Sequence, residues 1–156
     1  TELFADRFFM VASENDDVLV SPLNQHHVAL DRLLLLEEGH CLRDQALALC
    51  EDRPEANLVN YGATSLTTLL QMVASGMGRT LLPEIALPAE SLKRGDIRIM
   101  KFAPPVPERS IALFFRRGTH RRADFDALAA IITQISDVIF ADAQRALASY
   151  EVRATP

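Results

Sequence analysis

The sequence predicts an α/β domain with a mixed, mostly parallel sheet flanked by helices. Short apolar segments alternate with amphipathic ones along the chain, and strands that alternate with helices form mainly parallel sheets covered on both faces. The unbroken run Leu33–Leu36 is typical of a strand buried on both faces. The chain has 156 residues, of which 49% are hydrophobic, and this is enough to bury one core.

The first third of the chain predicts two strands and a helix. Residues 8–12 form a short apolar strand, followed by a polar loop over 15–22. A second strand over 33–36 leads through a turn at 37–40 into a helix over 41–50.

The middle third predicts two strands around one helix. Pro54 ends any helix before it, and residues 57–61 form a strand. Ser65 opens a helix with apolar residues at helical spacing, and Gly76 ends it. Residues 79–82 form the next strand.

The last third predicts two strands and the longest helix. Polar and apolar residues alternate over 96–102, which fits a half-buried strand, and residues 103–107 form a stiff proline-rich connector. A strand over 110–115 and a helix over 124–145 follow, with a frayed tail from 149. One face of that helix carries Phe125, Leu128, Ile132, Ile135, Ile139 and Ala143.

The two cysteines, Cys41 and Cys50, are nine residues apart. In one continuous helix they would be separated by roughly 13 Å, whereas a disulfide needs Cα atoms within about 4.4–6.8 Å of each other. They can therefore pair only if the helix unwinds, which would make the bond a switch. The alternative is a pair of inert core cysteines, since free cysteine packs as a small apolar group.

The surroundings of the two thiols differ. Cys41 falls in the first turn of its helix, where unpaired backbone N–H groups and the helix dipole favour an anion, and His40 and Arg43 are cationic neighbours. Two acidic residues follow Cys50 and disfavour a thiolate there. We expect Cys41 to be the reactive thiolate and Cys50 the resolving thiol.

Composition excludes several classes of function. The net charge of −5 argues against DNA binding by this segment itself. Two cysteines, no signal peptide and no long apolar run favour a soluble cytoplasmic protein without membrane association. We expect no metal at the His26–His27 pair. We also expect no nucleotide at Gly76 and Gly78, because those glycines precede a strand instead of following one.

The cysteine segment Gly39–Cys50 resembles that of the peroxide-sensing members of the LysR-type transcriptional regulators. Ala63–Leu66 and Gly76–Pro83 resemble LysR-type regulators in general. The resemblance resumes at Pro107–Leu113 and Arg116–Gly118, so that it covers most of the chain.

The resemblance implies a fold like that of type II periplasmic binding proteins, with two α/β lobes joined by two crossover strands. Residues 1–17 would then be the end of the first lobe and the first crossover strand, and 18–102 the second lobe with the redox switch. Residues 103–118 would be the connector and second crossover strand, 119–148 the C-terminal helix of the first lobe, and 149–156 a tail. We expect a fragment or natural truncation of a larger regulator.

The resemblance also implies roles for individual residues. Cys41 matches the peroxidatic cysteine and Cys50 the resolving one, while His40 and Arg109 match residues beside the reactive thiol. Thr64 and Ser65 match positions that contact effectors in other members. Simpler roles stay open: a loop histidine, a surface arginine and an N-cap.

The function implied is that of a hydrogen peroxide-sensing regulatory domain, not an enzyme, and it needs no cofactor. Its expected partners are hydrogen peroxide, a thiol reductant such as glutaredoxin or thioredoxin, and a second copy of the chain. DNA would be bound only through a helix-turn-helix domain absent from this chain. Two alternatives stay open: an effector domain for a small organic ligand, and a thiol peroxidase-like enzyme.

Overall fold

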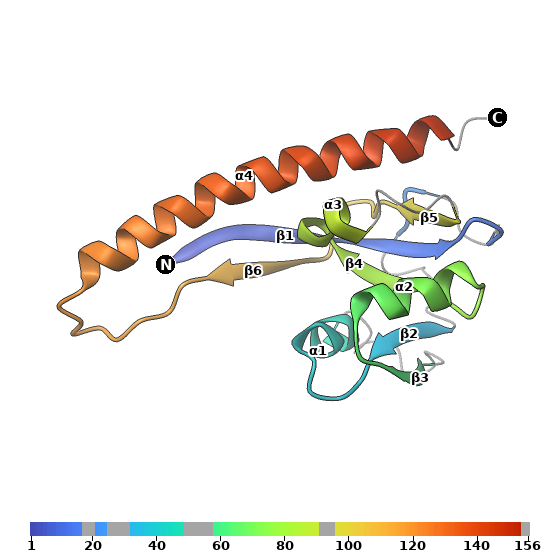
Figure 1. Ribbon diagram of the computed structural model, residues 1–156, viewed down its shortest axis with the longest axis horizontal. Coiled ribbons are helices and arrows are strands. Elements are labelled where there is room, and N and C mark those ends of the chain that lie inside the picture. The colour runs from blue at the N-terminus through green and yellow to red at the C-terminus, as the bar shows by residue number, and fades with distance from the viewer. Residues whose placement is uncertain (17–20, 25–31, 49–57, 91–95, 154–156) are drawn as a thin grey trace.

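A computed structural model describes residues 1–16, 21–24, 32–48, 58–90 and 96–153 (Figure 1). Its elements, in chain order, are β1 (Glu2–Ser13), β2 (Leu33–Leu36), α1 (Cys41–Ala48), β3 (Leu58–Ala63), α2 (Leu66–Ala74), β4 (Thr80–Pro83), the 3-10 helix η1 (Glu84–Ala86), α3 (Leu87–Glu90), β5 (Ile97–Met100), β6 (Glu108–Ala112) and α4 (Arg122–Arg153). Cys50, His26 and His27 lie outside the described residues.

Strand β1 is the centre of the larger sheet. Its second half pairs with β4 on one side and β5 on the other, and its first half pairs with β6, all antiparallel. Strands β2 and β3 pair in parallel, and a parallel bridge between Leu33 and Arg79 joins β2 to the start of β4. The predicted α/β fold with a mixed sheet is confirmed, but the expectation that the sheet is mostly parallel is wrong for the described residues. Three of the four strand pairs are antiparallel, because β1 runs against β4, β5 and β6.

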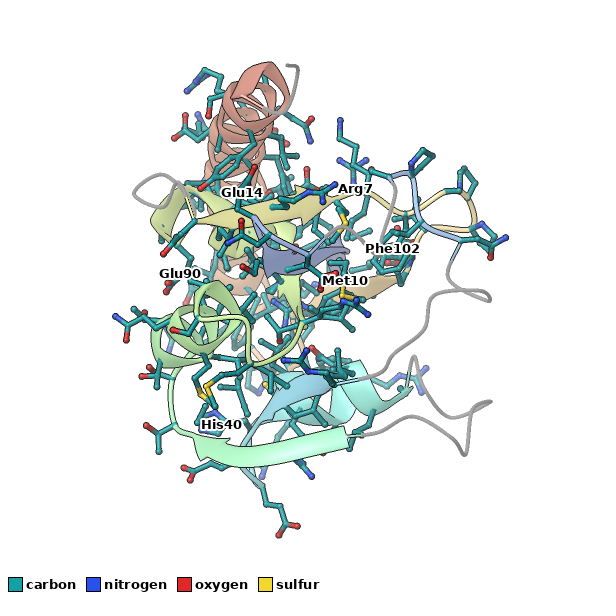
Figure 2. All side chains as sticks on the ribbon, turned by 90° about the vertical axis from the view of Figure 1, so that its right-hand side faces the viewer. Arg7, Met10, Glu14, His40, Glu90 and Phe102 are labelled. Atoms are coloured by element: carbon teal, nitrogen blue, oxygen red, sulfur yellow. The ribbon has the colours of Figure 1, made fainter. Side chains whose placement is uncertain are left out.

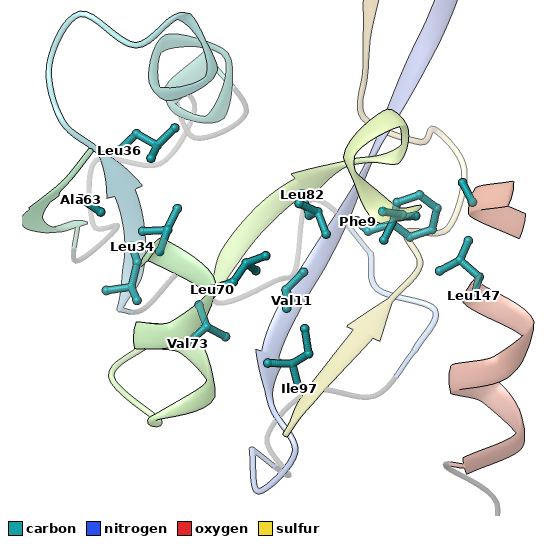
Figure 3. Close-up of a cluster of buried hydrophobic side chains, with 13 residues drawn as sticks. Phe9, Val11, Leu34, Leu36, Ala63, Leu70, Val73, Leu82, Ile97 and Leu147 are labelled. Carbon is teal, nitrogen blue, oxygen red and sulfur yellow. The ribbon is translucent and has the colours of Figure 1, made fainter. Parts of the chain in front are cut away.

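The core lies on both faces of β1. Phe8 and Met10 belong to one buried cluster, while Phe9 and Val11 belong to another, because successive side chains of a strand point to opposite faces. The second cluster continues from β2 through β4 to Leu147 of α4 (Figure 3). The apolar run at the end of β1 is therefore explained by helices and loops that cover both of its faces.

Helix α4 runs along β1 (Figure 1), and a buried carboxylate holds its second half there. Glu84 is 1% exposed and accepts two hydrogen bonds of 2.8 Å from Arg7 of β1 and one of 2.5 Å from Gln144 of α4. The hydrogen bond to Glu84 raises the pKa of Arg7. The first half of α4 leaves a row of apolar side chains exposed: Leu128, Ile131, Ile135 and Val138.

Strands β1 and β6 and the end of α4 differ from the sequence-based prediction. Helix α4 continues to Arg153 where a tail from 149 was predicted, because Leu147 and Tyr150 pack on the second core cluster. β1 begins at Glu2, six residues before the predicted start, and β6 covers 108–112 instead of 110–115. The cause is their pairing, which sets Asp6 opposite Arg109 and Arg7 opposite Glu108. Opposite charges across a strand pair are favourable, and hydrophobic alternation alone does not reveal them.

Candidate functional site

Cys41 is the first residue of α1, as the sequence predicts. Strand β2 ends at Leu36, and the chain then turns through Gly39, whose φ of +93° suits glycine. The thiol of Cys41 is free and its residue is exposed. It therefore stands at a helix N-terminus within reach of a small oxidant in solvent.

The two basic neighbours of Cys41, His40 and Arg43, both contact residues of the turn that leads into α1. His40 Nε2 lies 3.8 Å from Glu37 Oε1, and Figure 2 shows His40 at the end of the molecule opposite α4. Arg43 Nη1 donates to the backbone oxygen of Leu36 at 2.9 Å. In this state of the chain, the two side chains brace the β2–α1 turn.

Arg109 reaches α1 from the other side. Its Nη1 donates to Gln45 Oε1 at 2.9 Å, and Gln45 lies four residues after Cys41 in α1. Residues four apart in a helix are neighbours on one face, about 5–6 Å between Cβ atoms. The structure thus places the Arg109 guanidinium against Gln45, one helical turn after Cys41, and the arginine side chain is 19% exposed.

A buried carboxylate, Asp6, holds Arg109. Asp6 is 0% exposed, and its Oδ2 accepts from Arg109 Nε at 2.9 Å and lies 2.8 Å from Arg109 Nη2. Its Oδ1 accepts from the backbone N–H of Ile85 at 3.1 Å. We call the three hydrogen-bonded side chains of Gln45, Arg109 and Asp6 the Arg109 network.

Sequence reasoning missed Gln45 and Asp6. The position of Gln45, four residues after Cys41, was a usable signal, because it puts the two side chains on one helix face. Asp6, a carboxylate between Phe4 and Phe8, was a weaker signal. Its role is visible only once the register of β1 against β6 sets it opposite Arg109.

Ser65 caps α2 in the described structure. Its Oγ accepts from the backbone N–H of Thr68 at 3.2 Å and lies 2.9 Å from Thr68 Oγ1. Thr64, just before it, is exposed. The capping role of Ser65 is confirmed, and contact of either residue with a ligand stays a prediction.

The space beneath α1 is filled. A cavity of about 10 Å³ lies between β2, α1, α2 and β4, and Leu42, Arg43 and Ala46 are among its lining residues. A cavity of that size is at the lower limit for a single water molecule. A peroxide molecule, which is larger than water, does not fit in this cavity.

Two general features of the site follow from the described residues. Among them, no group of three or more His, Cys, Asp or Glu side chains is arranged to hold a metal ion. None of the described helices combines the length and hydrophobicity needed to cross a membrane.

The profile of the LysR substrate binding domain matches residues 1–136. The chain belongs to the LysR substrate-binding domain family. This LysR domain is 37% identical over 135 residues to the HTH-type transcriptional regulator EstR of Acinetobacter baylyi. The matched residues make up 86% of this chain and 45% of EstR. This LysR domain is 46% identical over 103 residues to a probable hydrogen peroxide-inducible genes activator of Streptomyces viridosporus, covering 65% of the chain and 33% of the activator.

The LysR domain is also similar to solved structures of OxyR. One is a cysteine-to-serine mutant of OxyR from Corynebacterium glutamicum with hydrogen peroxide bound. The TM-score is 0.78 and the identity 30%, over 92% of this chain and 46% of that one. The chain therefore spans less than half the length of these relatives.

Proposed function

We propose that this LysR domain senses hydrogen peroxide for a transcriptional regulator and responds by forming a Cys41–Cys50 disulfide. The observation that carries the proposal is the exposed Cys41 at the start of α1, one turn from a guanidinium held by the Arg109 network. The similarity to a peroxide-inducible activator and to a peroxide-bound OxyR supports peroxide as the oxidant.

The chemistry takes two steps. The Cys41 thiolate attacks one oxygen of hydrogen peroxide, the O–O bond breaks, and the departing hydroxide takes up a proton to become water. Cys41 is left as a sulfenic acid. The thiolate of Cys50 then attacks the sulfur of Cys41 and the S–O bond breaks. The departing hydroxide takes up a proton and becomes the second water. One peroxide is thus reduced to two waters while two thiols become one disulfide.

Arg109 and His40 are the proposed helpers of the first step. Breaking the O–O bond develops negative charge on the leaving oxygen, and a preorganised donor stabilises such charge. Arg109 already points one edge at α1 through Gln45. His40 precedes Cys41 and would have to exchange its contact with Glu37 for one with the oxidant.

The second step is the proposed switch. The helix from Cys41 to Ala48 has eight residues, so its ends are about 10 Å apart at about 1.5 Å per residue. We propose that pairing with Cys50 unwinds this helix. Unwinding would also break the Gln45–Arg109 hydrogen bond. Because Arg109 lies in β6 and bonds Asp6 of β1, the change in the thiols would then affect these two strands.

The remaining partners follow from this proposal. A thiol reductant such as glutaredoxin or thioredoxin would restore the two thiols, so that the domain is a reversible sensor and not a turnover enzyme. A cytoplasmic location would supply that reductant. We propose that the domain acts in a homo-oligomer and reaches DNA through a helix-turn-helix domain outside this sequence.

We also propose that residues 18–102 are the complete second lobe of a two-lobed regulatory domain and that 119–148 belong to the first lobe. The exposed apolar row on the first half of α4 supports this division, since such a row normally packs on another element.

Single-cysteine variants test the assignment of the two thiols. After treatment with peroxide, Cys50→Ser should carry a sulfenic acid on Cys41 that dimedone traps, and Cys41→Ser should give no peroxide response. Mass spectrometry of the labelled peptides reads both. Preferential dimedone labelling of Cys50 would reverse the assignment, and no labelling of either thiol would contradict peroxide sensing.

A further inference from the structure

We propose that Asp6 is a positioning residue for the peroxide reaction, because it fixes the direction in which Arg109 faces the turn of α1 that carries Cys41. This inference rests on the proposed function, since the direction of Arg109 affects a reaction only if Cys41 is the reacting thiol.

The first support is the way Asp6 is held. The β1–β6 register sets it directly opposite Arg109, and it is fully buried. Both of its oxygens are engaged, Oδ2 with Arg109 and Oδ1 with the backbone N–H of Ile85. The backbone bond fixes the plane of the carboxylate, so Asp6 is a rigid base for the arginine and not a mobile surface partner.

The second support is the division of the guanidinium edges. Nε and Nη2 of Arg109 face Asp6, and Nη1 is left to donate to Gln45. The guanidinium is planar and its donors have a fixed fork geometry, so fixing one edge fixes the direction of the others. The ring of Phe8, 5.8 Å from the guanidinium carbon, packs against the same group.

The third support is where the remaining edge points. Gln45 lies on the same helix face as Cys41, and helix side chains lean toward the N-terminus. The Nη1 group of Arg109 therefore faces the side of α1 on which Cys41 lies. Donors held in place before the reaction stabilise developing charge more effectively than mobile ones.

The negative charge of Asp6 allows its role in orienting Arg109 to be distinguished from a purely electrostatic effect on Cys41. A carboxylate beside Arg109 reduces the positive potential that Arg109 exerts on α1. Removing that negative charge should leave the thiolate of Cys41 at least as populated as before. If Asp6 acts through orientation, the reaction with peroxide should nevertheless slow.

The test compares Asp6→Asn with the unchanged chain, both carrying Cys50→Ser so that the sulfenic acid accumulates. Dimedone trapping at several peroxide concentrations gives the rate constant for Cys41, and the ultraviolet absorbance of the thiolate gives its populated fraction. We expect the rate constant to fall roughly 10- to 100-fold, as misplacement of a catalytic group does, while the thiolate fraction does not fall.

Glu84→Gln is the matched control. Glu84 is also a buried carboxylate that accepts hydrogen bonds from an arginine. That arginine is Arg7, which follows Asp6 in β1, and the other partner of Glu84 is Gln144 of α4, so Glu84 does not contact Arg109. This variant should keep the rate of the parent chain. An equal loss in both variants would overturn the inference, because it would show that lost stability and not the direction of Arg109 slows the reaction.

A second background keeps the inference testable if Asp6→Asn does not fold. In a chain carrying Arg109→Gln, adding Asp6→Asn leaves no unpaired charge and should cause no further loss of rate. A further loss there, or a parent-like rate in Asp6→Asn alone, would overturn the role of Asp6. A Cys41 that is inert in the parent chain would overturn the proposed function itself, and this role with it.

Discussion

Cys41 draws its proposed reactivity from three separate parts of the chain. The β2–α1 turn places it at a helix N-terminus, Gln45 brings Arg109 to the same helix face, and β1 supplies the carboxylate that holds Arg109. Lowering the cost of a thiolate is not sufficient for fast reaction with peroxide, because the leaving oxygen also needs a donor. At the scale of residues, we propose that the Arg109 network is what would separate this cysteine from an inert one.

The neighbours that sequence suggested for Cys41 have a different use. Arg43 bonds the end of β2, and His40 lies near Glu37. Both were expected to favour a thiolate simply because they are close in sequence. The arginine that approaches the helix comes instead from 68 positions further along, and only strand pairing brings it there.

At the scale of elements, α1 is the part that must change if the two cysteines pair. Leu42 and Leu47 are partly buried and pack against the core beneath the helix. Complete burial of a leucine side chain contributes about 1.5–3 kcal/mol, so releasing either of these partly buried leucines costs a part of that amount. The helix is short, and isolated helices of this length are marginal in water.

We therefore expect the amides of residues 42–48 to exchange hydrogen faster after oxidation by peroxide. Mass spectrometry of exchanged peptides from the reduced and oxidised chain measures this. Residues 69–73 of α2, which are largely buried in the second core cluster, provide the internal control and should keep their protection. Unchanged exchange in α1 would show that oxidation does not unwind it, and equal loss in α2 would indicate general unfolding.

The sequence predicted these elements unevenly. Strand β2, the start of α1 and the cap of α2 were predicted to the residue, because four leucines, a glycine turn and a serine cap are local signals. The first six residues of β1 were missed because their side chains are mixed and their pairing with β6 is long-range. The short helices η1 and α3 were also missed, since they lie in a stretch without sustained periodicity.

The same division applies to the candidate site. Cys41 could be placed from local sequence, and Arg109 was suggested by the family resemblance. Asp6 could not be found, because its role depends on the register that sets it opposite Arg109. Cys50 lies outside the described residues, so its pairing stays a prediction.

At the scale of the whole molecule, the first half of α4 carries an apolar row without a partner in the described structure. The row consists of Leu128, Ile131, Ile135 and Val138, whose exposed fractions are 42 to 59%. Of the stripe predicted from sequence, Leu128 and Ile135 are exposed, whereas Phe125 stacks on Phe115 with ring centroids 4.9 Å apart. Large exposed apolar patches usually mark interaction surfaces.

We expect the chain to cover this row by self-association, most simply as a two-fold dimer. The double variant Ile131→Glu with Ile135→Glu should shift the mass measured by light scattering toward that of a monomer. Ala130→Glu, which adds a charge at an exposed α4 position outside the row, should leave the association unchanged. A parent chain that is an ordered monomer at high concentration would contradict this expectation and the assignment of α4 to the first lobe.

A non-reducing peptide map after one equivalent of peroxide shows whether peroxide joins Cys41 to Cys50. We expect a peptide pair linked through these two residues, formed once per chain and removed by a thiol reductant. A map without that link would rule out the proposed disulfide switch and favour a LysR domain that responds to a small organic ligand. Sustained consumption of peroxide at the rate of a turnover enzyme, with reductant present, would favour a thiol peroxidase-like enzyme instead.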